Sequence, residues 1–331
     1  MGNFLETEKV KQTTYKLTSP TFSEMARSDG FYRTKYRPFC LPVERAEENL
    51  YPPIRETARK FFKDHGIKWH DGSNGNPSNH LCDSQVSCVN FLFPLADHPE
   101  TLAQILRPHF PMLKEMLPIE DGKYVSFEWI GEKNYLGEKI PQNGNRTRGA
   151  NCTSADAVVG FARVDGKKQI VLIEWKYTES YSPIPLAVSR RGTSRLEIYR
   201  RLYEAEDCPI KRNQLPGFED LFFEPFYQLM RQQLLANEME KAREVQADVV
   251  SLMHISPDHN IDFKRVTSER LLGLGSSSIN VWKNLINEKD RFLGISTEEL
   301  FGSTSPEVVA GMDEWFNYIW TRYPWVKEQS K

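Results

Sequence analysis

The sequence lacks the features that mark secreted and membrane-spanning proteins. Its 331 residues include five cysteines that form no CxxC pair, and this odd number fits reduced thiols better than a disulfide framework. Its longest wholly apolar stretches are too short to cross a bilayer. The opening run MGNFLETEKVKQ contains no apolar core, so we expect no signal peptide. These absences predict a cytoplasmic protein that does not associate with membranes.

The sequence also lacks a strong net charge and a nucleotide-binding loop. Lys+Arg 43 against Asp+Glu 45 gives a formal charge of −2, so a site for a polyanion would have to be a local patch. No GxxxxGK[ST] motif is present, so the sequence contains no recognisable ATP motor. What remains is a chain with 39% hydrophobic residues, enough to bury the core of an ordinary globular protein.

Glycine, asparagine and proline divide the chain into three zones. The loop DGSNGNPSN at residues 71–79 cannot hold a regular element, so it marks a boundary near residue 80. We therefore predict an N-terminal extension over residues 1–80, an orderly core over 81–256 and a C-terminal helical region over 257–331. The last region carries four tryptophans, and we expect a helix there over residues 306–323.

The first part of the core predicts helices followed by a strand. We expect helices over residues 83–93 and 99–106, which Asp83 and Pro99 are placed to open, in addition to a helix over 54–65. The run KYVSFEWI at residues 123–130 alternates apolar and polar side chains, which is typical of a sheet strand. This alternation predicts that Val125, Phe127 and Trp129 share one face and that Glu128 lies on the other.

Two further runs predict a hairpin with charges in unusual places. The runs SADAVVGFARV and QIVLIEWKY are strand-like, and Asp165-Gly166 between them is a strong turn signal. Asp156 lies in the first of these apolar strands. Glu174 and Lys176 are two residues apart in the second, so their side chains project from one face. Partly buried charges are costly unless they are paired or bind a metal, so this trio calls for a chemical explanation.

Metal-assisted phosphodiester hydrolysis is the chemistry that fits these three residues. Carboxylates on adjacent strands supply the hard oxygen ligands that Mg²⁺ prefers, with Mn²⁺ as a substitute. We expect Asp156 and Glu174 to bind the metal, with Glu128 as an additional ligand. Lys176 would assist the nucleophile and stabilise charge on the transferred phosphoryl oxygens.

Local context separates Glu174-Trp175-Lys176 from three similar tripeptides. Two of the other acid-X-Lys matches, at residues 121–123 and 165–167, are Asp-Gly turns, and the third, at 262–264, follows a loop rich in polar residues. Only the match at 174–176 ends a long apolar strand after an acidic residue in the preceding strand. The separation, 174 − 156 = 18, leaves room for two strands and one tight turn.

The residues after the hairpin predict a helix and a returning strand. A helix over residues 225–243 places Gln228 and Gln232 four apart on one face, with Arg231 beside them, where they could hold a phosphate or order the carboxylates. The run ADVVSLMHI at 247–255 then returns to the sheet. Residues 189–213 interleave arginines with Tyr199 and Tyr203, a pattern that could follow a phosphate backbone.

With this order of residues the chain resembles the PD-(D/E)XK nuclease superfamily. The runs RGANCTSADAVVGF, LIEWKYTESY and EPFYQLMRQQLLA are similar to those of a bacterial restriction-endonuclease-like family, over residues 81–256. The resemblance implies an α/β fold with a restriction-endonuclease-like mixed sheet core (αβββαβ) flanked by helices, with N- and C-terminal helical extensions. It assigns the strand acid to Asp156 and the (D/E)XK element to Glu174 and Lys176. Ala155 replaces the proline of the PD motif.

The same resemblance implies roles for further residues. An acidic residue from the first core helix is usual in the superfamily, and Glu128, Glu115 and the amide Gln85 are the candidates here. We expect Gln228 and Glu128 to act with the catalytic trio. Independently of the resemblance, the basic residues and the helix face themselves predict the side chains that contact nucleic acid, namely those of Arg146, Arg148, Arg190, Arg191, Arg231 and Gln232.

The function predicted is Mg²⁺-dependent hydrolysis of DNA by a restriction, defence or repair endonuclease. Alternatives are a nuclease for RNA or structured junctions, and a catalytically silent nucleic-acid-binding module with the same fold. Candidate protein partners are a second copy in a homodimer and a separate ATPase or methyltransferase.

Each prediction also has a structural alternative. Asp156 and Lys176 could form a cross-strand ion pair, and the glutamines could line a polar helix face. The arginine-rich segment could be an exposed helix that its own glutamates neutralise. A zinc site is a further alternative, although the spacing of its candidate ligands matches no familiar motif. Those candidates are His65, His70, His80, Cys82 and Cys88.

Overall fold

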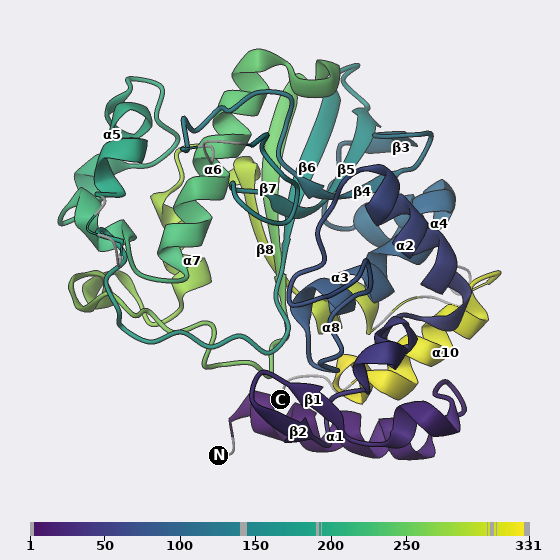
Figure 1. Ribbon diagram of the computed structural model, residues 1–331. Coiled ribbons are helices and arrows are strands. Elements are labelled where there is room, and N and C mark those ends of the chain that lie inside the picture. The colour runs from purple at the N-terminus through teal and green to yellow at the C-terminus, as the bar shows by residue number, and fades with distance from the viewer. Residues whose placement is uncertain are drawn as a thin grey trace.

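A six-stranded mixed sheet lies at the centre of the computed structural model, between two layers of helices (Figure 1). The structure describes residues 3–139, 144–189, 192, 194–302, 304, 308 and 310–327. The strand order is β3-β5-β6-β7-β8. β3 pairs with residues 160–163 of β5, and β4 pairs with residues 155–159 of the same strand. The strands are β3 (Leu113–Leu117), β4 (Val125–Trp129), β5 (Ala155–Arg163), β6 (Lys168–Trp175), β7 (Val249–Ser256) and β8 (Phe292–Ser296).

The predicted hairpin is the centre of this sheet. β5 and β6 pair antiparallel, with Ala157 opposite Ile173. Gly166 has a φ of +82° in the turn between them, a conformation that glycine adopts without strain. β7 then pairs parallel to β6, and β8 pairs parallel to β7, so β6 lies inside the sheet. Its residues 170–173 are apolar and pack alternately in clusters on the two faces, ahead of Glu174. The mixed sheet flanked by helices confirms the predicted fold class.

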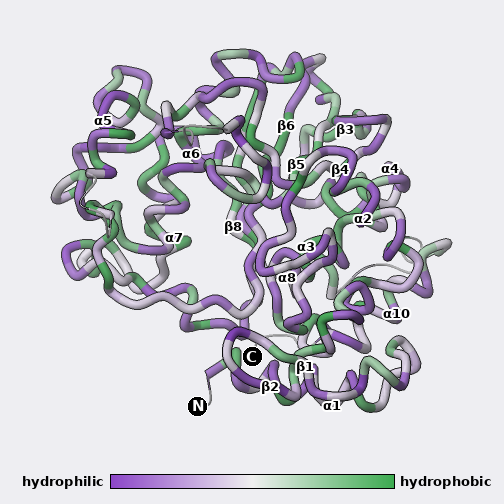
Figure 2. Tube along the Cα trace, viewed as in Figure 1, coloured by the Kyte–Doolittle hydropathy of each residue, from purple (hydrophilic) through white to green (hydrophobic). Residues whose placement is uncertain are grey.

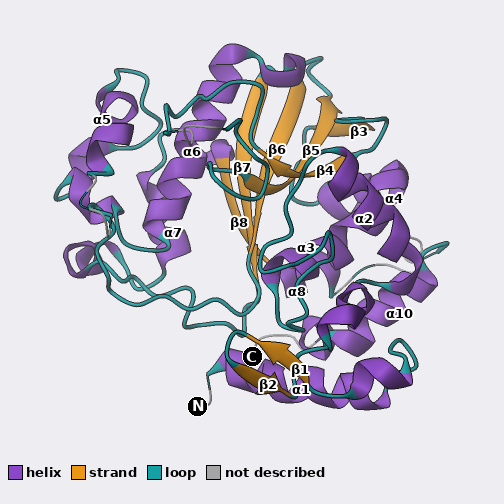
Figure 3. Cartoon of the chain, viewed as in Figure 1, coloured by secondary structure: helices purple, strands orange, loops and turns teal. Residues whose placement is uncertain are grey.

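Helices cover the two faces of the sheet with separate hydrophobic clusters (Figure 3). Residues alternate along β6: Val171 and Ile173 pack in the first cluster, whereas Ile170 and Leu172 pack in the second. Figure 2 shows the hydrophobic character of these central strands. The first cluster contains α2 (Arg55–Asp64), α3 (Ser84–Leu92), α4 (Pro99–Leu106), α8 (Thr297–Phe301) and α10 (Asp313–Arg322). The second contains α5 (Leu196–Glu204), α6 (Phe226–Ala242) and α7 (Ser278–Leu285).

The terminal zones pack against the core zone. α1 (Phe4–Thr18) lies beside the end of α10, where the Gln12 side-chain amide donates to the Arg322 carbonyl at 2.9 Å. A small antiparallel hairpin, β1 (Gly30–Tyr32) and β2 (Lys35–Arg37), follows α1. Trp315 and Trp325 belong to the first cluster, so these C-terminal tryptophans cover the sheet. The three predicted zones therefore share hydrophobic clusters.

Most predicted elements are present, with differences where the periodic signal is weak. Asp83 caps α3 as expected, because its carboxylate accepts from the Val86 backbone N–H at 2.8 Å. β1, β2, β3 and β8 are additional strands. β3 carries exposed Lys114 and Glu115 at an edge of the sheet, where charged residues are normal and hide the strand pattern. Within the described residues, no helix is long and apolar enough to span a membrane.

The predicted alternation along β4 is wrong at its last residue. Val125 and Phe127 pack in the first cluster, but Trp129 packs against the second. Between them Glu128 has a φ of +49°, an uncommon conformation for a residue with a Cβ. This backbone turn moves Trp129 to the opposite face of the sheet. Such local strain often accompanies a functional position.

Candidate active site

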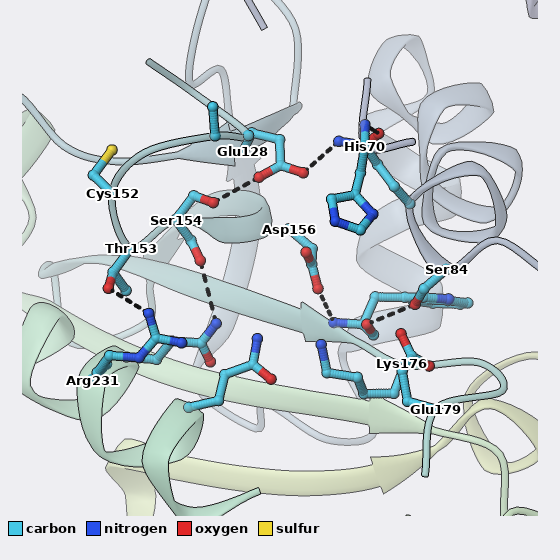
Figure 4. A pocket seen from close by; sticks show the side chains of 16 residues that line it. His70, Ser84, Glu128, Cys152, Thr153, Ser154, Asp156, Lys176, Glu179 and Arg231 are labelled. Atoms are coloured by element: carbon cyan, nitrogen blue, oxygen red, sulfur yellow. Dashed lines mark hydrogen bonds between the residues drawn. The ribbon is translucent and has the colours of Figure 1, made fainter. Parts of the chain in front are cut away.

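A polar pocket of about 350 Å³ opens where β6 ends and β5 begins (Figure 4). Its walls come from α3, the end of β4, the segment before β5, the end of β6, and α6. Its lining residues are His70, Ser84, Gln85, Glu128, Gly149, Ala150, Cys152, Thr153, Ser154, Asp156, Trp175, Lys176, Glu179, Gln228, Arg231 and Gln232. The pocket therefore collects most of the side chains singled out in the sequence.

Asp156 lies on the sheet face that α6 covers. Its carboxylate accepts a hydrogen bond of 2.7 Å from the Trp175 backbone N–H, which ties β5 to the end of β6 at the pocket. Burial raises the pKa of Asp156 well above its usual value, and the nearby carboxylate of Glu174 raises it further, against a smaller opposite effect of Lys176. A carboxyl group in this condition is stabilised in its charged form by an added cation.

Glu174 lies beneath the pocket rather than in its lining. It is 1% exposed, its carboxylate forms an ion pair with the Lys176 ammonium, and it also accepts from the Gln232 side-chain amide. The structure thus brings Asp156, Glu174 and Lys176 together as predicted. The ion pair involves Glu174 with Lys176, and not Asp156 with Lys176 as the structural alternative supposed.

Lys176 carries a positive charge inside the protein. Burial lowers the pKa of this ammonium, but the attraction of Glu174, with smaller contributions from Tyr181 and Asp156, outweighs burial and raises the pKa well above its usual value. Lys176 is therefore suited to donate hydrogen bonds and stabilise negative charge, and not to accept a proton. His254 pairs in register with Glu174, and burial, with the Lys176 charge, lowers the pKa of this imidazole to about 3.

Glu128 faces the pocket from β4, but its carboxylate already accepts hydrogen bonds from two neutral side chains. The Gln85 side-chain amide and the Ser154 hydroxyl each donate to it at 2.6 Å. Burial raises the pKa of Glu128, and those two hydrogen bonds act in the opposite direction. Gly149 approaches it closely with a φ of +74°, and a Cβ there would lie 2.6 Å from the Lys68 carbonyl oxygen. Of the three candidates for the additional acid position, Glu128 and Gln85 reach the pocket, whereas Glu115 is exposed on β3.

The residues predicted on one face of α6 do line one wall. Gln228, Arg231 and Gln232 all face the pocket, and the Arg231 guanidinium donates to the Thr153 hydroxyl at 3.1 Å. The Gln232 amide nitrogen contacts the Ser154 carbonyl at 3.3 Å as well as Glu174. Its buried Oε1 accepts no hydrogen bond within the described part of the chain. That oxygen is a third candidate donor to a cation.

The other predicted nucleic-acid contacts lie elsewhere. Arg146 donates to the carbonyls of Ile130 and Gly131, both at 2.8 Å, so it holds its own loop. Arg148 pairs with Glu120 at 2.9 Å. Arg190 and Arg191 lie outside the described residues. Neither Arg146 nor Arg148 lines the pocket, because their guanidinium groups serve intramolecular bonds.

The segment at 189–213 also differs from the pattern that suggested a phosphate track. Tyr199 and Tyr203 are buried in the second cluster rather than exposed. On the solvent side of α5, Arg200 pairs with Glu197 and Glu204, each at 3.2 Å. This part of α5 therefore matches the alternative of a neutralised helix.

Several pocket residues escaped the sequence interpretation. Thr153 and Ser154 lie three and two residues before Asp156, and Glu179 follows Lys176 by three residues, so proximity in sequence to the trio was the available signal. Ser84 begins α3, and its hydroxyl donates to the Trp175 carbonyl at 3.1 Å. His70, named above only as a candidate zinc ligand, directly precedes the boundary loop, where no periodicity could indicate that it faces a pocket.

The donor set suits a small hard cation better than zinc. Asp156 and Glu174 provide carboxylate oxygens, Gln232 provides an amide oxygen, and the Lys176 ammonium already occupies a cation position beside Glu174. Mg²⁺ is bound by one or two carboxylates and completes its shell with water and phosphate. Within the described ranges, no group of three or more His, Cys, Asp or Glu side chains could hold a metal. This applies to the five candidate zinc ligands and also to the predicted set of three carboxylates, Asp156, Glu174 and Glu128, so a cation here would need ligands other than a third carboxylate.

Comparison with known families identifies the chain over nearly its whole length. Residues 9–324 match the sequence model of a family described as "Restriction Endonuclease associating with ARP". The chain belongs to this restriction endonuclease family. The match reaches beyond residues 81–256 on both sides, so the family includes the terminal zones that complete the hydrophobic clusters. Searches of curated proteins and of solved structures found no match.

Proposed function

We propose that this chain is a Mg²⁺-dependent endonuclease of the PD-(D/E)XK class that hydrolyses DNA. One observation carries the proposal: two carboxylates and an ammonium from adjacent strands meet at the base of a polar pocket, Asp156 and Lys176 in its lining and Glu174 beneath it, although each is costly to bury alone. Membership in a restriction endonuclease family supports DNA as the substrate. The polar pocket, with Arg231 in its wall, suits a phosphate group.

Each residue has a role that follows from its charge and surroundings. Asp156 and Glu174 would hold the cation, with the Gln232 amide oxygen as an additional donor. The chemistry that Mg²⁺ supplies when bound is polarisation of the phosphate and acidification of a water molecule. Lys176, which stays protonated, would stabilise the charge that develops on the phosphoryl oxygens. Glu128 would order Ser154 and Gln85 at the rim.

The proposal is tested by cleavage and by an independent measurement of metal binding. Purified protein is incubated with plasmid and linear DNA plus Mg²⁺ or Mn²⁺, beside Asp156→Asn and Lys176→Ala. We expect metal-dependent cleavage by the wild type alone. We also expect Mg²⁺ to raise the Tm of the wild type in a concentration-dependent way, and to leave that of Asp156→Asn nearly unchanged. Cleavage that survives both substitutions would refute the assigned site.

A catalytically silent nucleic-acid-binding module is the second candidate. The observation in its favour is that Lys176 and Gln232 already occupy the Glu174 carboxylate, so the charge can be satisfied without a metal. On this alternative Mg²⁺ would not shift the wild-type Tm, and neither DNA nor RNA would be cut. Cleavage of RNA but not DNA would support the same active site with RNA as its substrate.

A protein partner is also part of the proposal. The family description names association with ARP, and we propose that the chain acts together with that partner. The test is co-purification of the two proteins after co-expression, with the wild type and with Asp156→Asn. Because Asp156 is at the pocket, we expect both forms to retain the partner equally.

A further inference from the structure

The N-terminal hairpin has a composition that the proposed catalytic pocket does not explain. Residues 30–40, GFYRTKYRPFC, contain three cationic and four aromatic side chains and no acidic one. β1 and β2 pair antiparallel with Tyr32 opposite Lys35, so the segment is an ordered hairpin with a tight turn at Arg33 and Thr34. A chain with a net charge of −2 concentrates positive charge here.

The hairpin borders a second cavity that adjoins the catalytic pocket. This cavity, of about 460 Å³, is lined by Tyr32, Arg33, Arg37 and Phe39 from the hairpin segment. The two cavities have four lining residues in common: His70, Ser84, Gln85 and Glu179. The two cavities therefore border each other at these four side chains, and the second cavity, from this border to the hairpin, is called the groove below.

The inner side of the hairpin is fixed to the protein. The Tyr32 hydroxyl donates to the Asp71 carboxylate at 2.6 Å, and the Tyr32 ring lies 4.9 Å from the His80 ring. The Asn79 side-chain amide donates to the Phe31 carbonyl at 3.0 Å. The hairpin is thus a rigid wall of the groove.

The outer side of the hairpin presents aromatic rings to solvent. Phe31 is 46% exposed and Tyr36 is 69% exposed, and their rings contact edge to face with centroids 5.4 Å apart. Exposed rings of this kind are platforms on which unpaired bases can stack, and stacking does not depend on the base sequence. The aromatic rings of α5 cannot act in this way, because they are buried.

The cations of the hairpin have little competition from carboxylates. The Arg33 side chain is 74% exposed, and its contact with Asp71 at 3.8 Å is a weak surface pair. Across the described ranges, no carboxylate pairs with Lys35 or Arg37 within 4.0 Å, and the Arg37 guanidinium lies 6.0 Å from the Phe39 ring.

Two of the three acidic residues that line the second cavity have partners outside the hairpin, whereas the third, Asp71, contacts Tyr32 and Arg33. Asp83 caps α3, and burial raises its pKa to about 7. Glu179 accepts from the Tyr177 backbone N–H at 2.8 Å. These two carboxylates therefore leave the cations of the hairpin free to meet phosphates.

We propose that the β1–β2 hairpin and the adjoining groove bind a single-stranded segment of the nucleic acid next to the cleavage site. Arg33, Lys35 and Arg37 contact phosphates, and Phe31 and Tyr36 stack on bases. The inference rests on the proposed nuclease function, because the groove begins at the catalytic pocket. It assigns the N-terminal zone a role in substrate binding.

The test measures binding without cleavage. The full-length protein, in EDTA, is titrated against a fluorescein-labelled DNA duplex with a single-stranded extension and against the same duplex with blunt ends. The variants are Arg33→Ala/Arg37→Ala and Tyr36→Ala. Matched controls are Arg107→Ala/Arg200→Ala, which removes two exposed cations elsewhere, and Tyr36→Phe, which keeps the ring. Circular dichroism verifies that each variant is folded.

We expect the extended duplex to bind more tightly than the blunt one. Each hairpin variant should weaken binding to the extended duplex by about tenfold, whereas both controls should bind like the wild type. The double arginine variant should also reduce the salt dependence of log Kd against log salt by about 1.4. Unchanged affinity of the hairpin variants, with the wild type still binding, would overturn the proposal. An equal loss of affinity in the Arg107→Ala/Arg200→Ala control would also overturn the proposal, because the loss would then follow from the lower net positive charge and not from the hairpin.

The same variants separate this inference from the proposed function. If the wild type binds the extended duplex through the hairpin but cuts nothing with Mg²⁺, the hairpin proposal stands and the nuclease proposal fails. If the wild type cuts DNA and the hairpin variants show the same KM and affinity, the nuclease proposal stands and the hairpin proposal fails. Binding of no nucleic acid at all would overturn the hairpin proposal.

Discussion

Asp156, Glu174 and Lys176 are held inside the protein, whereas Arg33 and Lys35 are exposed on its surface and Arg37 is half-buried beside them. The buried charges are costly to desolvate, and each depends on its neighbours, as the raised pKa values of Asp156 and Lys176 indicate. The surface charges are solvated, so they cost little and interact weakly with the rest of the fold. Substitutions in the pocket should therefore change stability and chemistry, whereas substitutions in the hairpin should change only binding.

Removing the buried cation gives the largest expected effect. Lys176→Met leaves the Glu174 carboxylate buried without its ion-pair partner, and we expect a loss of about 3–5 kcal/mol in the free energy of unfolding. Urea denaturation in metal-free buffer measures it. The matched double variant Glu174→Gln/Lys176→Met should recover most of the loss, because no unpaired charge remains. A loss as large in Arg33→Ala/Arg37→Ala would contradict the comparison.

Removing a pocket carboxylate should abolish most of the chemistry while leaving the hairpin intact. Asp156→Asn keeps an oxygen that can accept from the Trp175 N–H but loses the charge that holds a cation. We expect kcat for DNA cleavage to fall by roughly 10²–10³-fold, with DNA affinity in EDTA unchanged. Single-turnover cleavage and fluorescence anisotropy give the two values. If the DNA affinity of Asp156→Asn fell by as large a factor as kcat, catalysis in the pocket and DNA binding at the hairpin would not be separate functions.

The same variant should have a smaller and opposite effect on stability. The folded-state pKa of Asp156 is raised by burial and by Glu174 above its ordinary value of 3.8. Its ionisation therefore destabilises the fold as pH rises from that value through the folded-state pKa, and the penalty is absent below 3.8. Asp156→Asn should be about 1 kcal/mol more stable than the wild type at pH 7, with chelator present. Denaturation curves from pH 7 down to 4 should show this advantage decline, and an increase would disprove the assignment.

How well the sequence predicts a region depends on whether the contacts of that region are local in sequence. The meeting of Asp156 with Glu174 depends on one tight turn and on period-two alternation, which are local, so the sequence was sufficient. The Glu128 carboxylate accepts hydrogen bonds from Gln85 and Ser154, which are distant in sequence, and its backbone has a positive φ that alternation cannot predict, so alternation alone placed Trp129 on the wrong face.

The surface regions were harder to predict because exposure depends on tertiary packing. Residues 30–40 and 189–213 both interleave cations with aromatic rings, but only the second segment was predicted to follow a phosphate backbone. α5 has a helical periodicity that buries Tyr199 against Tyr227 of α6 and Tyr203 against Phe218. The strands of the hairpin are too short to bury Phe31 and Tyr36. Composition alone could not separate these two cases.

Arg200 provides the smallest expected effect and the sharpest contrast with the hairpin. Its guanidinium lies between Glu197 and Glu204 on the exposed side of α5, so its charge is already balanced on the surface. We expect Arg200→Ala to change unfolding free energy by less than about 0.5 kcal/mol and DNA affinity by less than twofold. Denaturation and anisotropy measure both. A tenfold loss of affinity would mean that α5 follows the phosphate backbone after all, because a neutralised arginine would not produce it.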